Sequence, residues 1–283
     1  MTRLLLCAVI CPFLISGCSA FKFRADPQTP HFTGSTFINT DRRYCREPSG
    51  IVFSARRGTL FVVDDEGAIC ELQLDGTLVK KKRINRADLE GLTLDPATGL
   101  LYAIEEHTKT ILEINPDSFE LLRQFQIETT PGIHLPTEKH SSKGIEAITF
   151  IPDPGHPSGG TFFIAGKGWR TRHAKSVAAV YEIDVPLHDT AAASRTAYMV
   201  RYFEPGISDL SGLHYDNRLQ QLLLISDSHD TLMLLTTDGK TRASYPLPGK
   251  NQEGITLDSE GYLYLAEDSG NIIRYTFDAT IKP

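Results

Sequence analysis

Residues 88–106, DLEGLTLDPATGLLYAIEE, hold two short apolar segments with a tight turn between them. The segments LEGLTL and LLYAIE are rich in leucine, β-branched and aromatic residues, and PATG at 96–99 has the turn chemistry that joins antiparallel strands. Two further apolar runs follow, TILEINP and LLRQFQI. The stretch therefore predicts four consecutive short strands, the usual content of one propeller blade.

An opening of the same kind occurs five times, in which an acidic or hydroxyl residue stands before a small residue and an apolar one. The small residues are Gly50, Gly91, Ala147, Gly212 and Gly254, spaced 41, 56, 65 and 42 residues apart. The gaps near 41 fit one four-stranded unit each, and the longer gaps leave room for insertions. Because short strands recur without a convincing amphipathic helix, the sequence predicts an all-β fold, a single β-propeller.

The last repeat ends after three apolar runs and lacks a fourth strand of its own. Residues 35–40, STFINT, can supply that strand from the other end of the chain, which leaves no sheet edge open. We therefore expect one β-propeller domain at residues 34–283 with five four-stranded blades, the last closed by this N-terminal strand. Six blades are the alternative, with a degenerate blade in the gap of 65 residues.

The N-terminus has the pattern of a secretory leader. Arg3 precedes an apolar run that is shorter than a membrane span. The run ends in LISGC, which resembles the bacterial lipobox, so we expect a signal peptide at residues 1–17, a lipidated Cys18 and a tether at 18–33. An ordinary cleaved leader with a coincidental Cys18 is the alternative. Acyl chains (palmitate among them) would anchor the chain firmly, and Ser19 favours the outer membrane, facing the periplasm.

Composition excludes several classes of protein. The 283 residues include 29 Lys+Arg and 35 Asp+Glu, a net charge of -6, which argues against nucleic-acid binding. With 41% hydrophobic and 23% charged residues the chain is not mostly disordered, and five cysteines are too few for a disulfide scaffold.

In an oxidising periplasm Cys45 and Cys70 can form one disulfide, and two buried thiols are the alternative.

Three of the repeat openings carry a glutamate at the third position, namely Glu90, Glu146 and Glu253. The first strand of each propeller blade lines the central channel, so these carboxylates are expected to face one another. A hard cation would relieve their repulsion, and carboxylate ligands suit Ca²⁺ first and Mg²⁺ second. The sequence has no Cys/His cluster of the kind that binds zinc, which disfavours that metal. The alternative is that these glutamates accept hydrogen bonds from backbone N–H groups of the next blade.

The second strand of each blade is expected to end where the first begins, because the two run antiparallel. Four of the five such ends are acidic, which predicts a negative channel mouth. At that mouth we expect Glu105, Asp227 and Glu267 to contact a ligand.

The third repeat breaks this acidity, because its second strand ends at Lys167, followed by Trp169 and Arg170. This basic loop would overhang the acidic mouth and bind an anionic ligand, with the indole stacking on a ring; a solvated hairpin tip is the alternative.

His107 and His229 also follow second strands, where they are candidates for general bases or simply solvent-facing side chains. The chain has no nucleophile elbow, P-loop or Rossmann fingerprint.

The segments DLEGLTLDPATGLLYAIEE, KGIEAITF, DLSGLHYD with LLLISD, and NQEGITLD with YLYLAED resemble the SdiA-regulated family of bacterial β-propeller proteins. The resemblance runs from about residue 45 to the C-terminus. It implies a β-propeller with a calcium site and no established enzymatic reaction. Two features depart from the pattern, Ala147 in place of glycine and an insertion at residues 152–160.

A rigid ring with one ligand-ready mouth and no catalytic motif predicts a binding protein. We expect a lipid-anchored, periplasm-facing propeller that takes a small anionic ligand at a calcium-bearing acidic mouth and contacts the membrane through Cys18. One alternative is a metal-dependent hydrolase of a phosphoester or lactone, in which the ion activates water. Another is an envelope protein-interaction platform.

Overall fold

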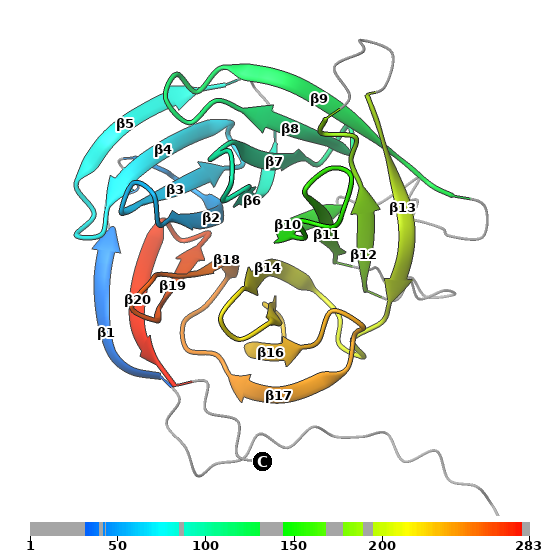
Figure 1. The fold of residues 1–283 in the computed structure, drawn as a ribbon. Coiled ribbons are helices and arrows are strands. Elements are labelled where there is room, and N and C mark those ends of the chain that lie inside the picture. Colours follow the sequence, from blue (N-terminus) through cyan, green and yellow to red (C-terminus); the bar gives the residue numbers. More distant parts are fainter. Residues whose placement is uncertain are drawn as a thin grey trace, which may run out of the picture.

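The computed structural model describes residues 32–39, 42, 44–84, 88–130, 144–167, 178–188 and 195–278. The regular elements in these ranges are twenty β-strands, which form antiparallel four-stranded meanders around a common centre (Figure 1). No helix in the described ranges is long and apolar enough to cross a membrane. The all-β, propeller-like architecture expected from the repeats is confirmed.

The meanders follow one another along the chain. The first contains β2 (Pro48–Ser54), β3 (Thr59–Asp64), β4 (Ala68–Gln73) and β5 (Leu78–Arg83). The second contains β6 (Leu89–Leu94), β7 (Leu101–Glu105), β8 (Thr110–Ile114) and β9 (Leu121–Glu128). The third contains β10 (Ile145–Pro152), β11 (Gly160–Gly166), β12 (Ala179–Asp184) and β13 (Thr196–Phe203). The fourth contains β14 (Leu210–Asp216), β15 (Gln221–Ser226), β16 (Thr231–Leu235) and β17 (Thr241–Pro246). The fifth contains β18 (Gln252–Leu257), β19 (Tyr262–Glu267), β20 (Asn271–Phe277) and β1 (Phe32–Asn39).

The first strand of each meander lies at the centre of the ring, and the last lies at its perimeter (Figure 1). Each inner strand contacts the next one around the ring, β2 with β6, β6 with β10, β10 with β14, β14 with β18 and β18 with β2. The ring is therefore closed, and the starts of the inner strands meet at one mouth of the centre.

The N-terminal strand β1 completes the fifth meander by pairing antiparallel with β20, with Phe37 opposite Ile273. It begins at Phe32, inside the segment predicted to be a tether. The reason is apolar packing, because the Phe32 ring lies 5.2 Å from that of Phe277 and 5.9 Å from that of Tyr275. The predicted signal peptide and Cys18 lie outside the described residues.

The second and third meanders are joined at the perimeter into one eight-stranded sheet. Their outer strands β9 and β13 pair in parallel, with Ala197 opposite Ile127 and Tyr198 opposite Glu128. The repeats alone do not predict this junction. Both strands have eight residues, so their ends extend far enough to satisfy each other's backbone groups.

The core consists of apolar clusters that lie between neighbouring meanders. One cluster spans the second and third, where the ring centroids of Tyr102 and Phe162 are 4.9 Å apart. Four more occupy the remaining junctions around the ring. Because every meander is packed on both faces, the inner strands are held rigidly, and so are the side chains that they direct towards the centre.

Candidate functional site

A bulge in each repeat opening positions the central side chains. The pairing of the two inner strands shifts register there in all the meanders. Four of these shifts pass over the third residue of the opening, which is Ser49, Glu146, Ser211 or Glu253. The fifth passes over Gly91, next to Glu90. Such bulges re-aim side chains, so the repeated opening marks where each inner strand turns one side chain out of the regular pattern.

The glycines of these openings are required by close approach between inner strands. A Cβ on Gly91, whose φ is +58°, would lie 2.8 Å from the Cα of Ala147 in the next meander. A Cβ on Gly50 would lie 2.6 Å from the carbonyl carbon of Gly91. The two serines at the third position also link neighbouring inner strands. Ser49 donates to the Leu89 carbonyl, and Ser211 donates to that of Gln252 at 2.6 Å.

Two of the three predicted glutamates form ion pairs with one amino group, that of Lys167, and the charge of Glu90 also acts on it. Its Nζ lies 3.2 Å from Glu146 Oε2 and 3.7 Å from Glu253 Oε2. The second distance is too long for a hydrogen bond, and Glu253 Oε2 is buried with no hydrogen-bond partner among the described residues. Lys167 was predicted to contact an anionic ligand, and in the structure its ammonium pairs with these carboxylates.

Electrostatics at the centre follow from this arrangement. Burial and the neighbouring Glu146 raise the pKa of Glu90 well above its usual value, although Lys167 opposes the shift. Burial likewise raises the pKa of Glu253 to about 8, against the lowering effect of Lys167. Burial alone would lower the pKa of Lys167, but Glu146, Glu253 and Glu90 outweigh it and raise that pKa, so the amine stays charged. A metal ion held by the three glutamates stays a prediction.

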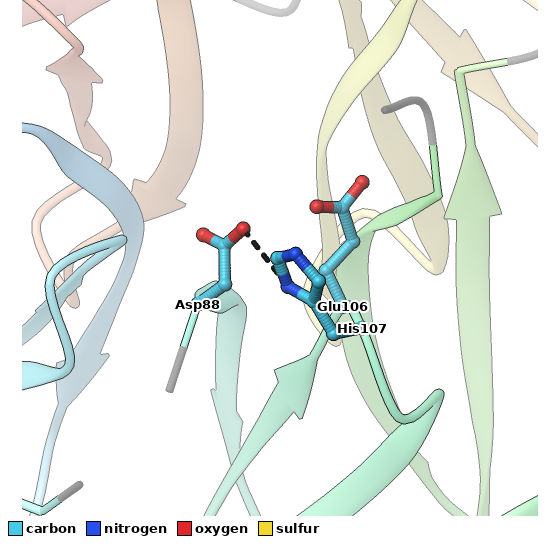
Figure 2. Close-up of side chains that lie close together, drawn as sticks. All are labelled: Asp88, Glu106 and His107. Atoms are coloured by element: carbon cyan, nitrogen blue, oxygen red, sulfur yellow. Dashed lines mark ion pairs between the residues drawn. The ribbon is translucent and has the colours of Figure 1, made fainter. Parts of the chain in front are cut away.

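The metal-capable clusters that the described residues do form lie at the rim of the mouth. In each of two groups, one ligand atom from each of three residues lies within 4.8 Å of those from the others. The first group is Asp88, Glu106 and His107, drawn in Figure 2. His107 Nδ1 lies 3.3 Å from Asp88 Oδ2, and the Glu106 carboxylate lies beside them.

Local backbone pairing holds this first group together. Asp88 precedes β6 and Glu106 follows β7, and the backbone N–H of Glu106 donates to the Asp88 carbonyl at 3.0 Å. Glu106 Oε1 also accepts from the Gly144 N–H at 2.7 Å, which ties it to the third meander. Burial, Glu146 and Asp88 raise the pKa of Glu106 to about 7, so this carboxyl ionises reluctantly without a cation.

The second group, Glu47, Asp65 and Asp268, joins the first meander to the fifth and consists of carboxylates alone. Asp65 Oδ1 is buried without a hydrogen-bond partner among the described residues. Burial and the charges of Glu47, Asp88 and Asp268 raise the pKa of Asp65 to about 7. A bound cation would favour the ionised form that these neighbours oppose.

One cavity of about 430 Å³ brings the two groups together. Its lining includes Glu47 and Asp65 from the second group and Asp88 and His107 from the first, together with Glu105. The lining also contains Glu66, whose carboxylate is paired with Arg46. The mouth is therefore strongly acidic on this side, as the sequence analysis expected.

The other predicted ligand residues have different surroundings. Asp227 accepts from the Gln252 N–H at 3.1 Å, and burial with the nearby Asp209 raises its pKa. Glu267 is 4% exposed and accepts from Asn271 Nδ2 at 2.9 Å and from the Lys250 N–H at 3.1 Å. These bonds show that Glu267 stabilises its turn, and its contact with a ligand stays a prediction. Trp169 and Arg170 lie outside the described residues.

The two predicted disulfide partners lie side by side as thiols. Cys45 and Cys70 are fully buried, and their Sγ atoms are 2.8 Å apart. Cys70 Sγ also contacts the Tyr44 carbonyl at 3.3 Å. Formation of the bond stays a prediction.

Sequence reasoning predicted the acidic mouth but assigned no metal ligand in the rim groups. It treated His107 only as a candidate base, and it gave no role as ligand to Asp88, Glu106, Glu47 or Asp268. A local signal was present in the run Glu105-Glu106-His107 after a second strand. Its partner Asp88 is the first residue of a repeat opening, and the antiparallel pairing of β6 with β7 brings it beside the run.

Comparisons with known proteins agree with this architecture. Residues 43–272 match the family model described as SdiA-regulated. The solved structure of Myxococcus xanthus glutaminyl cyclase is similar with a TM-score of 0.59 and 11% sequence identity, covering 88% of this chain and 96% of that one. At this identity the likeness shows the fold alone.

Among curated proteins, a UPF0173 metal-dependent hydrolase of Bacillus cereus (strain B4264) is 26% identical over 147 residues. One of Bacillus anthracis (strain A0248) is 28% identical over 144 residues. Each match covers 49% of this chain and 62% of the relative, so the chain spans less than two thirds of the length of these proteins.

Proposed function

Because the chain belongs to the SdiA-regulated family, we propose that it is a five-bladed β-propeller binding protein whose acidic mouth holds a divalent cation. Each four-stranded meander counts as one blade in this proposal. The bound ion is Ca²⁺ in the first instance, since Glu47, Asp65 and Asp268 offer carboxylate oxygens alone.

The observation that carries the proposal is the pair of rim groups that share one cavity. Carboxylates this close repel one another when ionised, and the raised pKa values of Asp65 and Glu106 are the result of burial and that repulsion. An external cation removes the repulsion. Among the described residues, Arg46 pairs with Glu66 at this rim, but no lysine or arginine pairs with Asp65 or Glu106, in contrast to Lys167 at the centre.

A cation at the mouth also gives the protein a means of binding an anion. The ion would coordinate a phosphate or carboxylate of a small ligand, and the basic segment after Lys167, with Trp169 and Arg170, would close on it. Lipidation at Cys18 would hold this mouth in the periplasm at the outer membrane. An envelope protein that presents an acidic group is a second partner of the same chemistry.

Metal-dependent hydrolysis is a second candidate function. The matched relatives carry the name of metal-dependent hydrolase, and His107 stands beside two carboxylates that suit a water-activating ion. In that reading a phosphoester or lactone would be the substrate, and the rim would hold the ion that lowers the pKa of a bound water.

The experiment is a Ca²⁺ titration followed by calorimetry and by melting temperature. Binding raises the stability of the folded chain by mass action, about 2.7 kcal/mol when free ion exceeds the dissociation constant a hundredfold. Asp65→Asn should weaken Ca²⁺ binding at least about tenfold, because it removes one anionic ligand. Asp75→Asn, in the β4–β5 turn, removes the same charge away from the mouth and should leave binding unchanged.

Absence of any Ca²⁺-dependent heat or melting shift would contradict the proposal. Turnover of a phosphoester or lactone that EDTA abolishes would favour the hydrolase instead.

A further inference from the structure

A second cavity, of about 480 Å³, lies in the fourth meander and shares no lining residue with the acidic one. Its apolar wall includes Ile207, Met233 and Tyr245, and its polar wall consists of His229, Asp230 and Thr231, which follow β15, together with Ser244. Its volume is in the range of small-molecule sites, and its mixture of an apolar wall with a few convergent polar groups is typical of them.

The hydrogen-bond network assigns the tautomer of His229. Ser226 Oγ lies 2.6 Å from the Ser208 carbonyl oxygen, which only accepts, so the single hydroxyl hydrogen of Ser226 is used there. Ser226 Oγ also lies 2.9 Å from His229 Nδ1 and therefore accepts from it. If Nδ1 carried no hydrogen, its lone pair would face a lone pair of Ser226 Oγ at that distance, which is repulsive.

Nδ1 thus carries the hydrogen in the neutral ring, and Nε2 carries a lone pair. Ser228 Oγ lies 3.1 Å from the same Nδ1, so both serines face that edge of the ring. The opposite edge, with Nε2, is left for the cavity that His229 lines, and Nε2 has no partner among the described residues.

Two further polar groups of the wall, on Thr231 and Asp230, present acceptors as well. Thr231 Oγ1 donates its hydrogen to the His229 carbonyl at 2.7 Å, which leaves only its lone pairs for the cavity. Asp230 presents a carboxylate whose Oδ1 receives one long bond, 3.4 Å, from Gln252 Nε2. The nearby acidic residues Asp209 and Asp227 add negative charge to the same turn. The Ser244 hydroxyl can donate, but acceptors and negative charge predominate, so the wall disfavours anions and favours a ligand that donates hydrogen bonds.

We propose that this cavity binds a small primary amine with an apolar body. The ammonium has three hydrogens to donate, which match Nε2 of His229, Oγ1 of Thr231 and the carboxylate of Asp230. The apolar body packs on Ile207, Met233 and Tyr245. The site is independent of the cation-binding rim and of the function proposed for it.

The test uses phenethylamine as probe, at about pH 7.5, where an alkyl amine is protonated. Phenethyl alcohol and hydrocinnamate serve as the neutral and anionic comparators of similar shape. Calorimetry in EDTA should show the amine binding at least about tenfold tighter than either comparator, the difference expected of a charged contact. Equal or tighter binding of hydrocinnamate, or no binding of the amine, overturns the proposal.

Two variants remove a hydrogen-bond acceptor from the cavity wall while keeping the shape of the side chain. His229→Phe keeps a ring without a lone pair, and Thr231→Val keeps the branched shape without the oxygen. Each should weaken amine binding severalfold or more, while the melting temperature falls by a few degrees at most, because each variant loses one or two hydrogen bonds of the turn. His188→Phe changes another exposed histidine, outside the cavity lining, and should have no effect. Unchanged affinity in both cavity variants overturns the assignment.

The tautomer has its own readout in the nitrogen-15 chemical shifts of the His229 ring. A protonated Nδ1 and a bare Nε2 are expected in the wild type. Ser226→Ala removes the acceptor that fixes this state, so the other tautomer should appear and amine affinity should fall, although Ser226 does not line the cavity. A wild-type ring with the hydrogen on Nε2 contradicts the argument.

Discussion

The centre of the ring and its rim both gather carboxylates, but they are neutralised in different ways. At the centre, the ammonium of Lys167 lies between Glu146 and Glu253, inside the protein and covalently part of it. At the rim, Asp65 and Glu106 face other acids, and the described residues place no lysine or arginine within ion-pairing distance of them. Acidic residues in a channel thus predict a cation. Their neighbours decide whether that cation is a side chain of the protein, as with Lys167, or a metal ion bound from solution.

Removing the built-in cation should have the largest effect. Lys167→Met leaves buried carboxylates uncompensated, and breaking such a buried pair costs about 3 kcal/mol or more. Melting in EDTA should fall by roughly 10 °C, on the scale of a few degrees per kcal/mol for a chain of this size. Added Ca²⁺ should recover part of the loss, because the centre then needs a recruited ion.

Lys240→Met is the matched control. Lys240 pairs with Asp238 at 2.8 Å on an exposed turn, where an ion pair contributes little. An equal loss of stability in both variants would mean that Lys167 has no special place among the glutamates.

The pH dependence of the metal-free protein separates the two regions next. The folded-state pKa values of Asp65 and Glu106 are raised to about 7 and that of Glu253 to about 8. The folded chain therefore binds protons more tightly than the unfolded chain, whose carboxyls titrate near about 4. Stability from these groups is fully present below that pH and is lost as the pH rises through about 7 and 8.

In EDTA, melting temperature should fall by several degrees between about pH 5.5 and about pH 8.5. Saturating Ca²⁺ should reduce the part of the fall due to Asp65 and Glu106 and leave the part due to Glu253. Stability that rises across this range in EDTA would contradict the assignment of these carboxyls.

Glu90→Gln sharpens the comparison with a smaller effect. Glutamine keeps the shape and removes one charge from a buried group that Glu146 already repels, so the variant should melt no lower than the wild type in EDTA. If Lys167 neutralises the centre, Ca²⁺ affinity should stay within about twofold, well below the tenfold that one lost ligand would give. A large loss of Ca²⁺ affinity would place the ion among the three glutamates, as the sequence pattern predicts.

Oxidation of Cys45 and Cys70 to a disulfide should have the smallest effect of these changes on Ca²⁺ binding at the rim. Cys45 stands two residues before Glu47, so a bond to Cys70 would restrict the segment that carries this rim carboxylate. Treatment with oxidised glutathione should remove the thiols of Cys45 and Cys70 from a thiol count, and Ca²⁺ affinity should rise by about threefold at most, since only local freedom is lost. Two thiols that persist in the folded protein would rule out the bond.

The repeated openings made the fold predictable, because each one encodes a bulge and a close strand contact through its own residues. Gly91 and Gly254 mark such contacts whatever lies elsewhere in the chain. The convergence of Glu90, Glu146 and Glu253 near the centre followed from this periodicity.

The rim could not be predicted in the same way. Asp268 reaches Glu47 only because the ring closes, and Lys167 reaches Glu253 only across two meanders. The pairing of β9 with β13 depends on how far two outer strands extend, which no periodic pattern records. Contacts between residues of different meanders could therefore not be predicted from the repeats.

The closing pair of β1 with β20 also sets the order of events during folding. Ser35 and Tyr275 face each other across nearly the whole length of the chain. Loop-closure entropy and high contact order make such a pairing slow, and it has no partner until the C-terminal strand has been synthesised. The ring thus stays open throughout synthesis, with its last edge available to other strands, and becomes one cooperative unit only after the whole chain has been delivered.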